Sequence, residues 1–256
     1  MIFVRLLMAG LLACLSAVAI ASEPASRNVG AGDADIPVTV YPAAGKNLVL
    51  WFPSEFGVLA AEHIAARHLA EKGHEVWLPD LYGARFLPVV PSSAEILPAE
   101  DVYQVIRAAA QPPRRKIWLL TAGRGAKYVL QGARLWQLRE GRHKPLAGAV
   151  LLYPNLYDKQ PEPGEDAGYL PIAGDTRLRI AILQGELSPW HWTLDSLQSA
   201  LRRKGSQVSV ENFPGIRDRF HFRDSATPAE RALGERLPEV IARVITNDRT
   251  AQRNKK

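Results

Sequence analysis

A turn between a predicted strand and a predicted helix is the first place where this chain could do chemistry. An apolar run at residues 117–120 predicts a short buried strand, and a helical pattern begins after residues 121–125, which are TAGRG. The pattern G-x-S-x-G at such a turn exposes a nucleophilic serine at its tip. Gly123 stands at the tip here. Glycine has no side chain that could attack a substrate, so the turn has the form of a nucleophile site without the nucleophile.

The rest of the chain alternates predicted strands with predicted helices. Strands are predicted at residues 48–52, 75–78, 117–120, 146–153, 180–183 and 208–213, and helices at 58–72, 101–110, after residue 125, at 194–204 and at 228–244. This alternation predicts an α/β fold with a mostly parallel sheet and helices on both faces. Ligands bind at the carboxyl ends of the strands in such sheets. We therefore expect a functional site in the loops that follow the strands.

This order of elements, together with the turn at residues 121–125, resembles the α/β-hydrolase superfamily. The stretch at residues 69–83, LAEKGHEVWLPDLYG, looks like the family's passage from a helix into a strand, which often ends in P-D-x-x-G. The resemblance is to the dienelactone-hydrolase-like and serine-peptidase-like branches and extends over about residues 48–244. It implies an α/β-hydrolase-like fold, but fold alone does not determine function.

The resemblance also implies where a catalytic triad would lie. The family's chain order is nucleophile, acid and then histidine. The nucleophile position falls on Gly123, the acid position on Ser188 in the segment GELSP, and the histidine position on Asp218 in the segment PGIRD. Three altered positions predict a degenerate triad. The first hypothesis is therefore a pseudoenzyme, a non-catalytic relative that binds a ligand or partner in the former active-site cleft.

A rearranged catalytic site is the alternative hypothesis. Ser54 follows the strand predicted at residues 48–52, and His221 follows the last predicted strand, so both belong to the same edge of the sheet. Asp218 or Glu186 would orient the histidine, giving a serine-type hydrolase of ester, thioester or peptide bonds. The role that the sequence favours for Ser54 is a cap of the helix that begins near Val58, since serine is common at such positions. If the segment around His221 is extended, its two flanking phenylalanines lie on the opposite face.

Arginines and tryptophans in these loops suggest ligand binding. Guanidinium groups close to a helix N-terminus favour an anionic ligand, and exposed indoles favour an aromatic one. The candidate residues are Arg124, Arg217, Arg219 and Arg223, with Trp190 and Trp192. The alternative is that the arginines pair with nearby carboxylates and that the tryptophans are half-buried. The histidines show no metal-ligand spacing, and we predict no metal and no cofactor.

The N-terminal residues 1–21 have the features of a secretory signal peptide. Arg5 precedes an apolar stretch at residues 6–20, and Ala19-Ile20-Ala21 forms a cleavage motif. A periplasmic or secreted protein is therefore expected. An uncleaved anchor and a lipoprotein attached at Cys14 are alternatives. Cleavage would remove Cys14, the only cysteine, and would leave no stable membrane span.

The remaining chain divides into an N-terminal segment at residues 22–46, one domain at 47–246, and a basic tail at 247–256 that we expect to be disordered. The 256 residues carry a formal net charge of +6. No nucleic-acid-binding motif is present and the basic residues are spread along the chain, so nucleic acid is not the expected partner. A small molecule or an envelope protein is expected instead.

Overall fold

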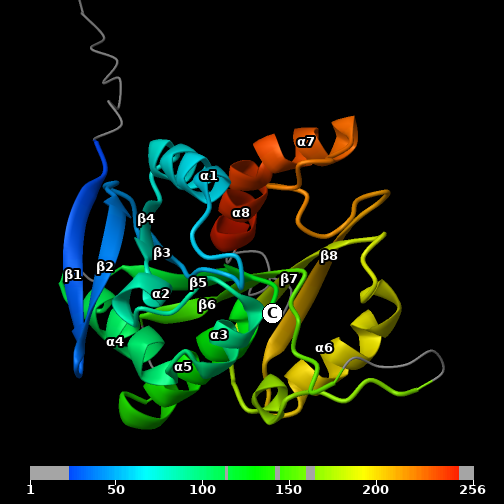
Figure 1. Cartoon of the computed structure of the whole chain (residues 1–256), viewed down its shortest axis with the longest axis horizontal. Helices are drawn as coiled ribbons and strands as arrows, with labels where there is room; N and C mark the ends of the chain where they lie inside the picture. Colours follow the sequence, from blue (N-terminus) through cyan, green and yellow to red (C-terminus); the bar gives the residue numbers. More distant parts are fainter. Residues whose placement is uncertain (1–22, 113–114, 142–144, 160–164, 248–256) are drawn as a thin grey trace, which may run out of the picture.

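The computed structural model describes residues 23–112, 115–141, 145–159 and 165–247. The predicted signal peptide lies outside these residues, as does the basic tail except for Asn247. The described chain forms an eight-stranded sheet in the order β1-β2-β4-β3-β5-β6-β7-β8 (Figure 1). The strands are β1 (Ala25–Ala31), β2 (Ala34–Tyr41), β3 (Asn47–Trp51), β4 (Glu75–Pro79), β5 (Lys116–Ala122), β6 (Leu146–Leu152), β7 (Arg179–Gly185) and β8 (Gln207–Phe213).

The six strands from β3 to β8 run parallel, as the sequence predicts. β3 pairs with β4 and β5, and β5, β6, β7 and β8 follow in order. β3 is buried at every position and β5 at every position but the first, because helices cover both faces of the sheet. These continuous apolar runs explain why the central strands are recognisable from the sequence. Their carboxyl ends meet at one edge of the sheet.

The described part of the segment predicted at residues 22–46, from residue 23 on, belongs to the sheet. It contributes β1 and β2, an antiparallel hairpin, and β2 pairs antiparallel with β4. In β2 the buried Ile36 and Val38 alternate with the exposed Asp35 and Pro37. This two-residue alternation marks a strand with one solvated face and not a continuous apolar run. The domain therefore begins at β1, and the boundary predicted at residue 47 is too late.

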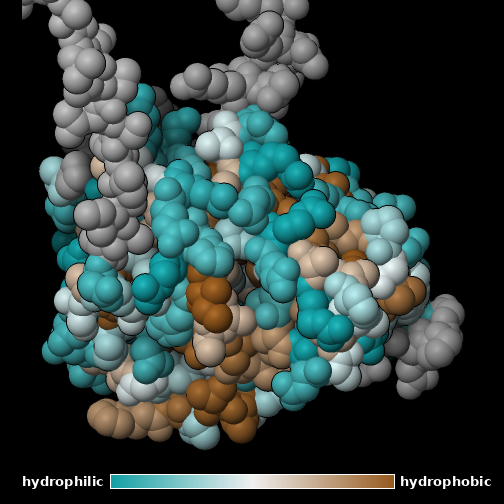
Figure 2. Space-filling model, turned by 90° about the horizontal axis from the view of Figure 1, so that it is seen from above, coloured by the Kyte–Doolittle hydropathy of each residue, from teal (hydrophilic) through white to brown (hydrophobic). Residues whose placement is uncertain are grey.

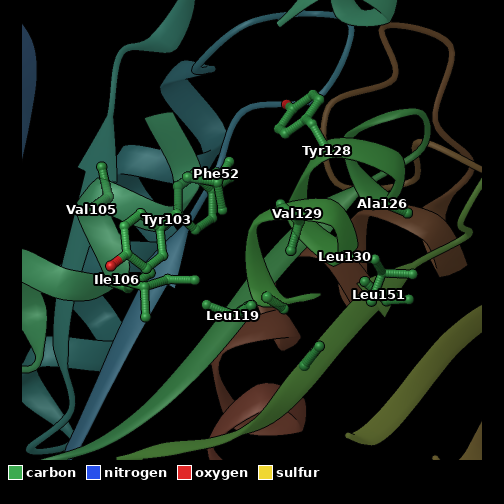
Figure 3. Close-up of a cluster of buried hydrophobic side chains, with 14 of the residues drawn as sticks. Phe52, Tyr103, Val105, Ile106, Leu119, Ala126, Tyr128, Val129, Leu130 and Leu151 are labelled. Carbon is green, nitrogen blue, oxygen red and sulfur yellow. The ribbon is translucent and has the colours of Figure 1, made fainter. Parts of the chain in front are cut away.

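The larger helices cover the two faces of the sheet (Figure 1). They are α1 (Ala60–Glu71), α4 (Ala99–Ala109), α5 (Gly125–Arg139), α6 (Leu194–Arg202), α7 (Pro228–Glu235) and α8 (Leu237–Thr246). Side chains of α4, α5 and α6 form one buried cluster, and those of α1, α7 and α8 form another. Figure 3 shows part of the first cluster. Leu119 of β5 and Phe52, which directly follows β3, belong to this cluster together with Val129 of α5.

Two stretches depart from the predicted elements. Two short helices, α2 (Leu81–Ala84) and α3 (Pro91–Ile96), lie between β4 and α4, where the sequence predicts no helix. The single helix predicted at residues 228–244 is divided into α7 and α8 at Arg236. Pro238 at the second position of α8 has no N–H to continue the hydrogen-bond ladder of α7, which accounts for the break. The segment at residues 154–177 contains one 3-10 turn, η1 (Pro171–Gly174), among its described residues.

Candidate functional site at the carboxyl edge of the sheet

A cleft of about 360 Å³ lies at the carboxyl edge of the sheet. Its walls come from the loops after β3, β5, β6, β7 and β8, the loops that the sequence singles out. The exposed apolar side chains of Phe86, Val89, Val90 and Ile96 belong to the segment before α4. In Figure 2 a group of apolar side chains extends from the centre to the lower edge of a largely hydrophilic face, with smaller apolar groups on the right. A Cβ atom at Gly57 would lie 3.1 Å from Val89, so this apolar segment reaches the loop after β3.

The strand-to-helix turn at Gly123 forms as predicted. β5 ends at Ala122, α5 begins at Gly125, and Gly123 between them has φ +52°. A left-handed backbone at this tip is adopted readily by glycine and with strain by other residues. Gly125 also has no room for a side chain, because an added Cβ would overlap Thr121 Oγ1 and lie 2.7 Å from the Pro53 carbonyl oxygen. Tight packing therefore requires small residues on this turn.

The carboxylate of Glu55 fills the space in front of Gly123. A Cβ atom at residue 123 would lie 2.5 Å from Glu55 Oε2 and 2.9 Å from Oε1. The backbone N–H of Arg124 donates to the same Oε2 at 2.9 Å. A negative group at a helix N-terminus is stabilised by the free amides and the helix dipole. Glu55 was not among the predicted site residues, although its place directly after β3 is a signal that it belongs to this edge.

Ser188 and Asp218, which the resemblance assigns to the acid and histidine positions, lie in contact. The Ser188 hydroxyl donates to Asp218 Oδ2 at 2.9 Å, and Gln184 Nε2 donates to Oδ1 at 3.4 Å. Burial raises the pKa of Asp218 to about 6, against the lowering effects of the Ser188 hydrogen bond and of two nearby arginines. The two positions therefore meet as a hydroxyl and a carboxylate. This pair contains no imidazole to take a proton from a nucleophile.

Ser54 is buried and bonded within its own loop. It is 1% exposed, and its Oγ accepts a hydrogen bond from the Phe56 N–H at 3.2 Å. Its carbonyl oxygen accepts from the Gly57 N–H at 3.1 Å and from the Tyr82 hydroxyl at 2.9 Å. In the described part of the chain no hydrogen bond joins Ser54 to His221. The predicted Ser54–His221 pair is therefore not formed, because the hydroxyl is engaged in closing the turn.

The prediction that Ser54 caps the following helix is also wrong. α1 begins at Ala60, and its N-cap residue is Leu59. The side chain of Glu62 reaches back, and its Oε2 accepts from the Leu59 N–H at 3.0 Å. The helix therefore starts too far from Ser54 for that serine to cap it, and Glu62 satisfies the terminal amide instead.

Among the described residues, His221 forms no hydrogen bond or ion pair with Asp218 or Glu186, the carboxylates proposed to orient it. Its side chain is 3% exposed; Nδ1 lies 3.4 Å from the Tyr153 hydroxyl, and Nε2 lies 3.9 Å from Glu62 Oε1. Glu186 is engaged elsewhere, since its Oε2 accepts from the Gly215 N–H at 2.9 Å. The segment around His221 forms turns and not an extended strand, with Arg219 at φ +61°. The predicted face alternation is therefore wrong, and the rearranged triad is not assembled.

The predicted arginine cluster is divided by ion pairs. Arg124 pairs with Glu95 at 2.7 Å, and Arg217 pairs with the buried Glu230 at 2.6 Å. The hydrogen bonds from Arg217 lower the pKa of Glu230 to about 2. Both guanidinium groups are therefore largely neutralised by the chain itself. For these two residues, the alternative of pairing with carboxylates is the one the structure shows.

Arg219 and Arg223 remain at the cleft. Arg223 donates to the backbone oxygen of Asp218 through Nε at 3.3 Å and Nη2 at 3.1 Å. The guanidinium carbon of Arg219 lies 5.6 Å from the centre of the Phe56 ring. These contacts leave the positive charges of both residues beside the cleft.

The two candidate tryptophans lie in different surroundings. Trp190 lines the cleft, and its ring centre is 4.6 Å from that of Tyr157. Trp192 is 58% exposed and is not part of the cleft wall. The cleft therefore has one indole available to contact a ligand.

Two further properties concern the described residues only. They contain no cluster of His, Cys, Asp or Glu side chains suited to a metal ion. They also contain no helix that is long and apolar enough to cross a membrane.

Comparison with solved structures shows the α/β-hydrolase fold. An esterase from Pyrobaculum calidifontis has a TM-score of 0.68 and 15% identity, covering 89% of this chain and 86% of the esterase. A dienelactone hydrolase-like promiscuous phosphotriesterase from metagenomic libraries has a TM-score of 0.63 and 15% identity, covering 87% of this chain and 98% of its own. Esterase 2 from Thermogutta terrifontis, in a form phosphorylated by paraoxon, has a TM-score of 0.59 and 15% identity. The match covers 87% of this chain and 92% of the esterase.

No family model and no curated protein sequence matches the chain. The chain is thus similar to hydrolases in fold, while its sequence has diverged from theirs. At these identities the likeness establishes the fold, and the activity has to be inferred from the site itself.

Proposed function

We propose that this protein is a non-catalytic relative of the α/β-hydrolases that binds a small ligand in the former active-site cleft. The observation that carries the proposal is the position of Glu55. Its carboxylate lies where a side chain at residue 123 would project, and it accepts the hydrogen bond of the Arg124 amide. In an acyl-transfer enzyme, backbone amides at this turn stabilise the developing oxyanion. Here a resident anion takes that hydrogen bond.

The candidate replacement nucleophile also argues for binding without hydrolysis. Ser54 is buried and its hydroxyl faces the Phe56 amide, so it lacks both access to a substrate and a base within hydrogen-bond reach. The Ser188 hydroxyl donates a hydrogen bond to the carboxylate of Asp218 and has no imidazole as its acceptor. Neither arrangement provides the nucleophile, imidazole and orienting acid of a serine hydrolase.

The cleft retains the features of a ligand site. Its volume of about 360 Å³ lies within the range of roughly 300–1,000 Å³ that is common for small-molecule pockets. Trp190 and Phe56 supply aromatic surface, and Arg219 and Arg223 supply positive charge. An anionic or aromatic ligand is therefore the proposed occupant. We further propose that the protein acts after export, in the periplasm or outside the cell, as the features of residues 1–21 suggest.

Labelling with a fluorophosphonate probe tests this proposal, because the probe reacts with activated serines. The purified mature protein is incubated with the probe after circular dichroism has established that it is folded. We expect no labelling, and we expect Ser54→Ala and Ser188→Ala to behave as the wild-type protein does. Labelling mapped by mass spectrometry to Ser54 or Ser188, and lost in the matching variant, would overturn the proposal and make the protein a serine hydrolase.

A further inference from the structure

Four charged side chains of opposite sign line the cleft without pairing with one another. Glu55 and Asp218 provide two carboxylates, and Arg219 and Arg223 provide two guanidinium groups. Across the described residues, no nitrogen of either arginine lies within 4.0 Å of a carboxylate oxygen. Carboxylates and guanidinium groups that line the same cleft commonly form ion pairs with one another.

The same chain does neutralise neighbouring charges elsewhere. Arg85 makes an ion pair with the fully buried Asp101 at 2.6 Å, and Arg217 does so with the fully buried Glu230 at 2.6 Å. Both arginines use several nitrogens on the same carboxylate, which is the strong geometry for such a pair. This fold can therefore hold a guanidinium group against a carboxylate in that geometry, and the four charged side chains of the cleft are not paired in this way.

Uncharged groups hold the two carboxylates in place. Glu55 accepts from the Arg124 backbone amide, and its other oxygen faces the space beside Gly123. Asp218 accepts from the Ser188 hydroxyl and the Gln184 amide. These partners fix the position of each carboxylate without cancelling its charge. Both negative charges thus remain available to a positive group of a ligand.

The two arginines are likewise held by uncharged groups. Arg223 donates to a backbone oxygen, and Arg219 lies over the ring of Phe56. The left-handed backbone at Arg219 is adopted with strain by a residue with a side chain, and such strain is concentrated at functional sites. Both positive charges thus remain available to a negative group of a ligand.

We propose that the ligand of this cleft is a small zwitterion with one ammonium group, one carboxylate or phosphate group, and an apolar or aromatic body. This inference rests on the proposed binding function. The ammonium group meets Glu55 and Asp218, and the anionic group meets Arg219 and Arg223. The body lies against Trp190. A ligand with negative charge only would place part of that charge near two carboxylates, which lowers its affinity through like-charge repulsion.

Two sources supply this chemistry. One is a free aromatic amino acid or a short peptide, whose termini carry the two charges. The other is the phosphoethanolamine headgroup of a phospholipid, whose acyl chains would continue out of the cleft. Both carry an ammonium group and an anion within a few bonds of each other. The experiment therefore includes both.

Isothermal titration calorimetry measures binding at pH 7.5, where Asp218 is ionised. The ligands are L-phenylalanine, the dipeptide Ala-Phe, phosphoethanolamine, N-acetyl-phenylalanine without the ammonium charge, and phenylalanine amide without the carboxylate. We expect either Ala-Phe or phosphoethanolamine to bind. Binding of Ala-Phe would identify an amino acid or peptide as the ligand, and binding of phosphoethanolamine would identify a phospholipid headgroup. We expect each blocked phenylalanine to bind at least about tenfold more weakly than its parent compound. N-acetyl-phenylalanine that binds as tightly as phenylalanine would overturn the zwitterion inference and leave the proposed binding function standing.

Charge-removing variants assign each end of the ligand. Glu55→Gln keeps an oxygen for the Arg124 amide and should weaken binding of the zwitterion about tenfold, but not binding of the acetylated compound. Arg219→Gln should weaken the zwitterion and leave the amide unaffected. Arg231 of α7 is exposed and lies outside the cleft wall, so Arg231→Gln is the matched control. This variant should bind every compound with wild-type affinity. Thermal unfolding of each variant verifies the fold.

The remaining outcomes are also decisive. If all variants bind the zwitterion with wild-type affinity, the ligand lies elsewhere and the inference is wrong. If no compound binds and the fluorophosphonate probe does not label the protein, the zwitterion inference is wrong while the non-catalytic proposal stands. If no compound binds and the probe labels a serine, both proposals are wrong.

Discussion

A methyl group added at residue 123 is a direct probe of the carboxylate in front of it. In Gly123→Ala the new Cβ atom would lie 2.5 Å from Glu55 Oε2, so the carboxylate has to move away. Moving it breaks the charge-assisted hydrogen bond from the Arg124 amide, which is worth about 1.5–3 kcal/mol. The left-handed backbone, with φ +52°, adds a strain of about 1–2 kcal/mol for alanine. We expect Gly123→Ala to lower the free energy of unfolding by about 2.5–5 kcal/mol, the sum of these two contributions.

A double-mutant cycle separates the two contributions. Glu55→Ala removes the carboxylate, and in this background Gly123→Ala should cost only the backbone strain. The predicted coupling energy between residues 55 and 123 is therefore about 1.5–3 kcal/mol, the worth of the hydrogen bond. Gly32→Ala is the matched control, because Gly32 has φ +65° and an added Cβ would meet nothing within 4 Å. It reports the strain alone.

Urea unfolding followed by tryptophan fluorescence measures all four members of the cycle and the control. The reasoning requires Gly123→Ala to cost clearly more than Gly32→Ala in the wild-type background and about the same in Glu55→Ala. A coupling energy below about 0.5 kcal/mol, the usual limit for independent sites, would refute the placement of Glu55 against the turn.

Three further predictions concern the surroundings of the site. Burial raises the pKa of Asp218 to about 6, well above its usual value near 3.8. The folded state therefore binds the carboxyl proton of Asp218 more tightly than the unfolded state does. The free energy of unfolding accordingly falls as the pH rises from about 4 to 6. Asp218→Asn should remove up to about 3 kcal/mol of that fall in urea unfolding between pH 4 and 7, and an unchanged pH profile would contradict it. Arg217→Met leaves the carboxylate of Glu230 without its partner and should lower the free energy of unfolding, measured by thermal or urea unfolding. Near-neutral behaviour would show that the pair is dispensable. Gly125→Ala should destabilise the fold by more than 1 kcal/mol, because its Cβ atom overlaps Thr121 Oγ1, and the additional Thr121→Ala change should recover part of the loss; no recovery would place the clash elsewhere.

The parallel sheet and the turn at Gly123 could be predicted because their signals are local. β3 and β5 are continuous apolar runs, and a strand buried on both faces produces such runs. The small residues of the turn follow from its tight geometry, with Gly125 packed against the Pro53 carbonyl. The hairpin β1–β2 was missed because β2 alternates between buried and exposed residues, a weaker pattern that a search for apolar runs passes over.

The polar contacts could be predicted only in part. Ser188 and Asp218 follow neighbouring parallel strands, and the resemblance assigned them to the acid and histidine positions, but the hydrogen bond between them was not predicted. The partners of the arginines were not evident, since Arg217 reaches Glu230, which lies 13 residues further along on α7. Ser54 and His221 do belong to the same edge of the sheet, but the orientation of each side chain is set by neighbours that no local pattern reveals.

The sequence by itself determined the order of strands and helices, the small residues of the turn, and the lack of a side chain at Gly123. Those properties follow from apolar periodicity and from the residue type at one position. Only the tertiary structure decided what occupies the space in front of that turn and which charges stay unpaired. Glu55 is 68 residues before Gly123, and its carboxylate reaches the Arg124 amide because β3 and β5 are adjacent in the sheet. Hydrogen bonds and ion pairs extend over a few ångströms, so contacts between distant residues depend on how the strands are ordered and packed.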